Sequence, residues 1–202
     1  DFTTWDLPRL FAEIDKHFQQ ALSHAAILKQ TPVAKFDEVL EKGGVPDRYR
    51  PTLYDFIAHE ALQFYTSGEQ AAAKPQDAYE LPASSPIFDK AEKLLAWWRS
   101  FDRKQFPDSP IVKALDLYGA LMAFHEKDED ATALLDVDLA RLVYGYNTAF
   151  GEAKAERYKA ALKTFVGQWA DHEVSAMALY HWARVVKDEG DIVEARTLAQ
   201  RG

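Results

Sequence analysis

Three histidine–glutamate pairs carry the residue types best suited to metal chemistry. They are His59-Glu60, His125-Glu126 and His172-Glu173. A zinc site of the His-Glu-x-x-His type needs a second histidine four residues after the first, because both imidazoles must project from one face of a helix. Those positions hold Gln63, Glu129 and Ala176 instead. Because that ligand is missing, we predict no metal site and expect these histidines at surface or capping positions.

The turn Asp128-Glu129-Asp130 concentrates enough carboxylate to suggest calcium binding. An EF-hand loop that starts at Asp128 would need glycine at its sixth position and glutamate at its twelfth. This chain has Ala133 and Leu139 there. A solvated acidic turn that also caps the following helix fits these residues better.

The sequence carries no recognisable catalytic motif. It contains no G-x-S-x-G nucleophile elbow, no Walker loop for phosphates and no glycine fingerprint for dinucleotides. Asp136 and Asp138 are two residues apart, so on a helix they point to different faces and make a poor acid–base pair. We therefore predict that the chain is not an enzyme and uses no cofactor.

Composition limits the partners of the chain. Its 24 basic and 32 acidic residues give a net charge of −8, which disfavours nucleic acid as a partner because such binding needs clustered Lys and Arg. No apolar run approaches the ~18 residues of a membrane-spanning helix, so we expect no span in this segment. The absence of cysteine excludes disulfides, thiolate metal sites and thioesters within it.

The balance of apolar residues predicts an all-α fold. The chain has 31 Ala and 20 Leu but only 17 Val and Ile together, and β-branched residues lose more side-chain freedom in a helix. Helix starts are expected at Asp6-Leu7-Pro8, Pro51-Thr52, Ser85-Pro86 and Ser109-Pro110. The first helix should run to Gln30, and a short second helix through Leu40 should end at Gly43. Further helices are expected over 133–150, 152–170, 174–187 and 192–201. Short connections between them indicate an irregular array of antiparallel helix hairpins.

The domain organisation follows from length and from one irregular stretch. A chain of 202 residues predicts a single helical domain, 1–202. Residues 68–85 form the one long irregular segment, so sub-lobes 1–67 and 86–202 are the alternative division. The chain begins Asp1-Phe2-Thr3 without Met and without a leader pattern. We therefore expect a processed chain or a fragment of a larger protein.

The C-terminal helix pair resembles a tetratricopeptide repeat. The matching positions are Leu179, Trp182, Ala183, Val186, Gly190, Ala195 and Ala199. Small residues at such positions let two antiparallel helices approach closely, and the glycine breaks the chain between them. Val186 and Ala199 depart from the pattern, since an aromatic residue is commoner at both. Two ordinary antiparallel helices remain the alternative, because matches to a single repeat are frequent.

Several segments resemble the N-terminal helical region of large alpha-2-macroglobulin family proteins from Bacteroidetes. The longest is residues 50–62, RPTLYDFIAHEAL, followed in the same order by 117–125, LYGALMAFH, and 136–142, DVDLARL. Gly190-Asp191 with Ala195 resembles the tetratricopeptide-like end of that region. The resemblance runs from about Leu7 to Gly202, and its motifs are structural rather than catalytic.

The resemblance implies a role as one module of a larger protein. The parent would be a periplasmic, cell-surface or secreted envelope protein whose later domains resemble broad-range protease inhibitors. This segment would then be a non-catalytic scaffold or interaction module. Its partners would be the other domains of the parent or another protein, with proteases engaged through the parent.

A free-standing tetratricopeptide-like adaptor for peptides or proteins is the alternative function. The two hypotheses differ in the surface they require. A concave face bearing Tyr118, His125, Arg141 and Tyr144 would favour the adaptor. A flat or convex face would favour the scaffold. A helical enzyme ranks last, because no convergent set of ionisable residues supports it.

Overall fold

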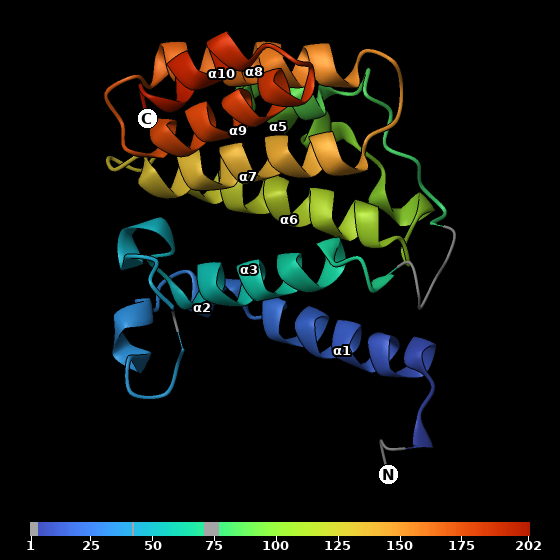
Figure 1. Cartoon of the computed structure of the whole chain (residues 1–202). Helices are drawn as coiled ribbons and strands as arrows, with labels where there is room; N and C mark the ends of the chain where they lie inside the picture. Colours follow the sequence, from blue (N-terminus) through green and yellow to red (C-terminus); the bar gives the residue numbers. More distant parts are fainter. Residues whose placement is uncertain (1–3, 42, 71–76) are drawn as a thin grey trace. The chain divides into compact units, whose positions relative to one another are not determined.

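The computed structural model describes residues 4–41, 43–70 and 77–202, and it confirms the all-α prediction. Nine α-helices occur among these residues and pack in adjacent pairs (Figure 1). Their bounds are α1 (Leu7–Leu22), α2 (Ala25–Leu28), α3 (Leu53–Thr66), α5 (Ala91–Ser100), α6 (Pro110–His125), α7 (Thr132–Thr148), α8 (Lys154–Gln168), α9 (Val174–Asp188) and α10 (Ile192–Ala199). The 3-10 helices are η2 (Val33–Phe36), η3 (Asp47–Tyr49), η4 (Pro86–Phe88) and η5 (Arg103–Gln105). The described part of the chain contains no strand, only two isolated β-bridges.

Some predicted helices are shorter than the sequence suggested. The first one stops at Leu22, because the Ser23 hydroxyl donates to the carbonyl oxygen of Gln20 (2.7 Å) and competes with the helical pattern. The chain resumes as α2, so the prediction of one helix to Gln30 was wrong. The short helix expected through Leu40 is only the 3-10 helix η2. Likewise, the start at Ser85 gives the single turn η4 before α5 begins.

The chain divides into two compact units that interleave in sequence. Unit 1 comprises Asp1–Tyr79 with Asp102–Ala133, and unit 2 comprises Glu80–Phe101 with Leu134–Gly202. These bounds do not coincide with the sub-lobes 1–67 and 86–202, because η5 and α6 belong with the N-terminal helices. Residues 71–76 of the irregular stretch lie outside the described residues.

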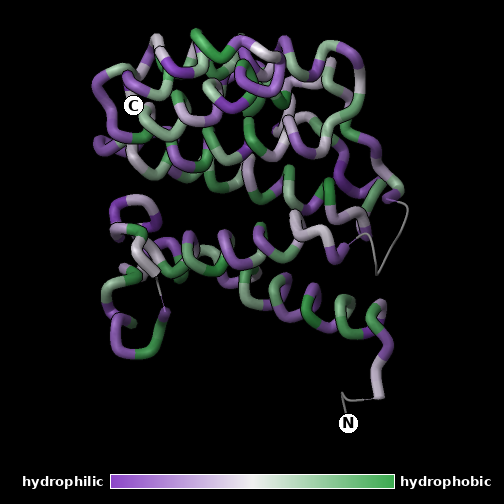
Figure 2. The backbone as a smooth tube through the Cα atoms, viewed as in Figure 1, coloured by the Kyte–Doolittle hydropathy of each residue, from purple (hydrophilic) through white to green (hydrophobic). Residues whose placement is uncertain are grey.

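Unit 1 is organised around α3, which packs against α1 and α6. The rings of Phe11 and Phe18 on α1 contact Phe64 on α3 at centroid distances of 5.2 and 5.7 Å. Hydrophobic residues recur along α1 at helical spacing (Figure 2), although none of its residues is buried. At its other end α3 begins with a capping box between Thr52 and Asp55. α3 is therefore fixed by apolar packing along its length and by polar bonds at its start.

In unit 2 the segment 81–89, which contains η4, packs closely against α7. The N–H of Ala83 donates to the carbonyl of Phe150 (2.8 Å), and the Phe150 N–H donates to Leu81 (3.0 Å). Gly145 on α7 allows this approach, because a Cβ atom there would lie 2.6 Å from Cγ1 of Ile87. Ile87 itself is 1% exposed. The segment is thus part of the core of unit 2 and not a surface loop.

The C-terminal pair α9 and α10 forms an antiparallel hairpin (Figure 1). Gly190 ends α9 with a φ of +96°, which favours glycine. The chain end returns to the start of α9, where a Cβ on Gly202 would lie 3.1 Å from the Ala176 carbonyl oxygen. The repeat-like residues Leu179, Ala183, Val186 and Ala195 are buried, whereas Ala199 is exposed. Of the small residues in the pattern, Ala183 and Ala195 are buried and Ala199 is not.

Candidate functional site

The four residues predicted to line an exposed face are all buried. The exposed fractions are 6% for Tyr118, 2% for His125, 1% for Arg141 and 7% for Tyr144. Because none of them reaches the surface, the structure does not place them on a concave face that a partner could contact. The physical reason is that α6 and α7 carry buried residues around most of their circumference. These side chains take part in internal packing and bonding.

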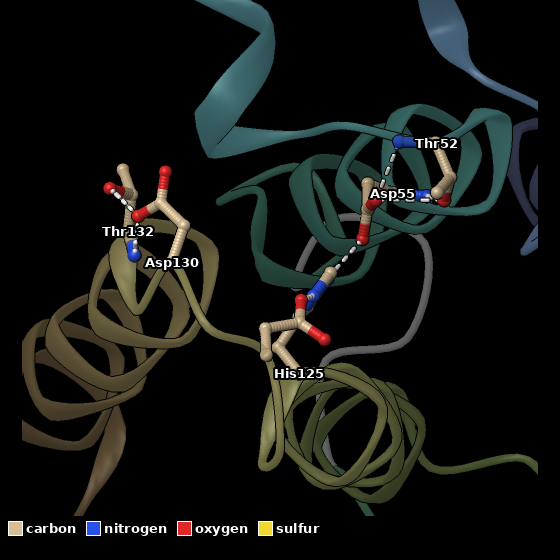
Figure 3. A network of polar contacts seen from close by, with 6 residues as sticks. Thr52, Asp55, His125, Asp130 and Thr132 are labelled. Carbon is tan, nitrogen blue, oxygen red and sulfur yellow. Dashed lines mark hydrogen bonds and ion pairs between the residues drawn. The ribbon is translucent and has the colours of Figure 1, made fainter.

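His125 lies at the centre of a buried polar network in unit 1 (Figure 3). Its Nε2 is 2.7 Å from Oδ1 of Asp55 on α3, and its Nδ1 is 2.6 Å from Oδ2 of Asp128 in the turn after α6. The second oxygen of Asp55 accepts bonds from the backbone N–H and the hydroxyl of Thr52, both at 2.8 Å. One imidazole therefore links the end of α6 to the start of α3.

Two opposing effects act on the pKa of His125. Burial is the largest influence and lowers it, because an imidazolium loses hydration inside the protein. The hydrogen bonds and charges of Asp55 and Asp128 together outweigh burial and raise the pKa above its ordinary value of 6.5. The network consequently favours the protonated ring.

Unit 2 contains a second buried network, built on two arginines. Arg141 donates through Nε to Asp138 on the preceding helical turn (2.8 Å), and its terminal nitrogens donate to the carbonyls of Ile87 and Asp89. Arg157 on α8 donates to the carbonyls of Ala83 and Ser85 and pairs with the Asp89 carboxylate (2.9 Å). Together the two side chains tie the segment from Ala83 to Asp89 to α7 and α8.

A pocket of about 300 Å³ opens beside this network, also within unit 2. Its wall includes Asp138, Arg141 and Arg157, and its apolar side includes Phe165 and Trp169. The volume lies at the lower end of the range for small-molecule sites. Both arginines on its wall are paired with carboxylates.

The remaining histidine–glutamate pairs lie on α3 and just before α9. Among the described residues no group of three or more His, Asp or Glu is arranged to hold an ion. His59 is part-buried on α3, and burial, followed by the charge of Arg50, lowers its pKa to about 3. His172 accepts a bond from the N–H of Val174, the first residue of α9 (3.2 Å), although the N-cap itself is Glu173. The prediction of a surface or capping position was wrong for His125, which is 2% exposed.

The acidic turn behaves as the sequence suggested in one respect. Asp130 accepts bonds from the N–H (2.9 Å) and the hydroxyl of Thr132, the first residue of α7. It therefore caps the following helix. Its neighbour Asp128 instead turns toward His125, a pairing that sequence reasoning missed.

The exposed apolar side chains offer a different kind of site. On α9, Met177 is 53% exposed and Tyr180 is 51% exposed, and Arg184 follows one turn later on the same side. The Arg184 guanidinium lies 5.8 Å from the centroid of the Tyr180 ring. Spacing of three and four residues places the three side chains in one stripe. The opposite side of α9 is buried within unit 2.

Comparison of the chain with protein-family models, with curated proteins and with solved structures finds no match in any of the three. The fold and the candidate sites define an all-α protein, with nine helices among its described residues packed in adjacent pairs. No helix in the described ranges is long and apolar enough to cross a membrane.

Proposed function

We propose that the chain is a non-catalytic helical interaction module that meets its partner through the exposed stripe of α9. The observation that carries the proposal is the stripe itself, formed by Met177, Tyr180 and Arg184. Tyr, Met and Arg are the residue types enriched at protein–protein interfaces, and Tyr and Arg are frequent hot spots.

The helix that carries the stripe, α9, is packed into unit 2 by its opposite face. Ala178 is fully buried, and Leu179 and Ala183 are 5% and 7% exposed. α9 packs with these residues against α8 and α10. A surface on such a helix is preorganised, so a partner would order few side chains on binding.

We further propose that the parent is an alpha-2-macroglobulin-like envelope protein, periplasmic or at the cell surface, whose whole chain acts in protease inhibition. The support is the resemblance of residues 50–62, 117–125 and 136–142 to that family's N-terminal helical region. These segments supply Asp55, His125, Asp138 and Arg141, which build the two buried networks. Segments that hold a fold together are what a shared scaffold would retain. The expected partners are other domains of the parent.

A free-standing adaptor is the second candidate, and the pocket in unit 2 is the observation that favours it. Its apolar side, with Phe165 and Trp169, could receive one side chain of a bound segment. This function needs no neighbouring domains. The two candidates therefore predict different partners for the stripe of α9.

Photo-crosslinking in the complete parent protein tests both candidates. After the reading frame on each side of the segment has been determined, benzoylphenylalanine replaces Tyr180, or Lys163 on the exposed side of α8 as the control. A crosslink from position 180 to another domain of the parent supports the scaffold. A crosslink to a separate protein, or a reading frame that stops directly after Gly202, supports the adaptor. Equal yields at both positions contradict a role for the α9 stripe.

A further inference from the structure

The strongest feature outside the proposed interaction surface is the pair of hydrogen bonds that His125 makes through its two ring nitrogens. Each of its ring nitrogens lies within 2.7 Å of an oxygen of a different carboxylate, on Asp55 and Asp128. An ionised carboxylate only accepts hydrogen bonds, and a neutral imidazole has a single N–H to donate. When both carboxylates are ionised, both bonds can exist together only if the ring carries two protons.

We propose that His125 holds the turn 126–131 in a pH-dependent way, and we call its two hydrogen bonds to Asp55 and Asp128 the clasp. The clasp is closed when the ring is doubly protonated and bonded to Asp128. It opens, and the turn is released, when Nδ1 gives up its proton. The clasp lies wholly within unit 1 and is independent of the proposed interaction function. In the closed form the imidazolium bridges the start of α3 and the turn that follows α6.

The surroundings of the two carboxylates decide which bond opens. Asp55 is 1% exposed, so water cannot replace a lost donor there. Its Oδ2 is already engaged by Thr52, and Oδ1 faces the ring. The Asp128 side chain is 42% exposed, and water can solvate it as soon as it leaves the ring. The neutral ring should therefore keep its proton on Nε2, toward Asp55, and lose the bond to Asp128.

The charges around His125 place the opening above pH 6.5, the ordinary value for an imidazole. Asp55 from α3 and Asp128 from the turn favour the imidazolium and raise the pKa of His125 despite its burial. His59, also on α3, is held neutral by its own depressed pKa of about 3. Lys29, which follows α2, lies over the rings of Tyr54 and Phe124 at 4.5 and 4.6 Å and is attracted to Asp55. The clasp thus stays closed below pH 6.5 and opens as the pH rises through the raised pKa.

Nitrogen-15 NMR of the histidine rings in the unmodified chain is the primary test. At pH 6.5, where an ordinary imidazole is half protonated, we expect the ring nitrogens of His125 to show mainly the shifts of an imidazolium, and well above its pKa we expect the Nε2–H tautomer alone. A ring that is mainly neutral at pH 6.5, or an alkaline form protonated on Nδ1, overturns the proposal.

Two matched variants extend the test to the turn. Asp128→Ala removes the releasable partner, and Glu129→Ala removes a neighbouring exposed carboxylate of the same turn. The amide of Asp128 reports the closed turn, because it donates to the His125 carbonyl (3.1 Å). We expect Asp128→Ala to lower the pH at which His125 titrates and to reduce protection of this region by about tenfold, as for loss of a charged hydrogen bond. We expect Glu129→Ala to change neither. Equal effects of the two variants would show that general charge, not the clasp, holds the turn.

Discussion

Replacing Gly145 with alanine tests the closest helix–segment contact in unit 2. Gly145 lies inside α7, where η4 crosses it. An added Cβ would lie 2.6 Å from Cγ1 of Ile87 and 3.1 Å from a ring carbon of Phe88. The first distance is far below van der Waals contact, so one of the two elements would have to shift.

The expected magnitude follows from two opposing terms. In a helix interior, alanine is favoured over glycine by about 1 kcal/mol. Overpacking a filled core costs about 1–3 kcal/mol. We expect the upper half of that range, because Ile87 is buried and its carbonyl is held by Arg141. The net result should be a destabilisation of about 1–2 kcal/mol.

Gly167→Ala is the matched control, because Gly167 lies in α8 of the same unit and, apart from its chain neighbours and the nearby backbone of its own helix, no atom lies within 4 Å of its Cβ position. We expect this change to stabilise unit 2 by up to about 1 kcal/mol. Urea unfolding followed by tryptophan fluorescence measures both. Four of the five tryptophans lie in unit 2, namely Trp97, Trp98, Trp169 and Trp182. If both variants gained stability equally, Ile87 would not lie against Gly145 and the described packing would be wrong.

Three further changes test the polar contacts. Thr52→Ala removes one side of the α3 capping box and should lower the free energy of unfolding by about 1 kcal/mol in urea titrations; no change would mean that the cap is not formed. Arg157→Ala should lower the free energy of unfolding by about 2 kcal/mol, because Asp89 and two carbonyls lose their hydrogen-bond donor. Arg157→Lys should recover less than half of this loss, because an ammonium lacks the forked donors of a guanidinium. Full recovery by lysine would show that only the charge matters. Because the folded pKa of His59 is about 3, the unfolded chain takes up its proton first as the pH falls below 6.5. Between pH 7 and pH 5 the free energy of unfolding of the wild type should therefore fall by about 2 kcal/mol more than that of His59→Leu. Urea unfolding at each pH measures both, and parallel pH profiles would contradict the prediction.

The local signals of the sequence predicted much of the fold. Asp6, Thr52 and Ser109 each accept a bond from a backbone N–H in the first turn of the helix they begin. Gly151 and Gly190 have positive φ angles where helices were expected to end. These signals work because a cap or a left-handed glycine depends on residues only a few positions away.

The long-range contacts could not be predicted in the same way. Arg157 and Asp89 are 68 residues apart, and His125 and Asp55 are 70 apart, so no spacing rule links them. The burial of Tyr144 depends on which helices cover both sides of α7. The sequence of one helix does not show which of its faces other elements bury. A polar or aromatic residue on a buried face therefore cannot be told apart from one on a solvent-exposed face. The two short-range pairs, His125 with Asp128 and Arg141 with Asp138, have the i, i+3 spacing that a sequence does display.

The histidine and the arginine that sequence analysis proposed for an interaction surface, His125 and Arg141, form ion pairs inside the two units. Arg141 and His125 are nearly inaccessible, and their partners Asp138 and Asp55 are 8% and 1% exposed. Breaking such a buried pair is costly, whereas forming it adds little net stability, so its main effect is to fix one arrangement of the neighbouring segments. A partner must therefore be met by side chains that remain accessible to solvent. On α9 those are apolar, aromatic and guanidinium groups, which suit recognition of another protein surface, and this supports our proposal that the chain acts in binding.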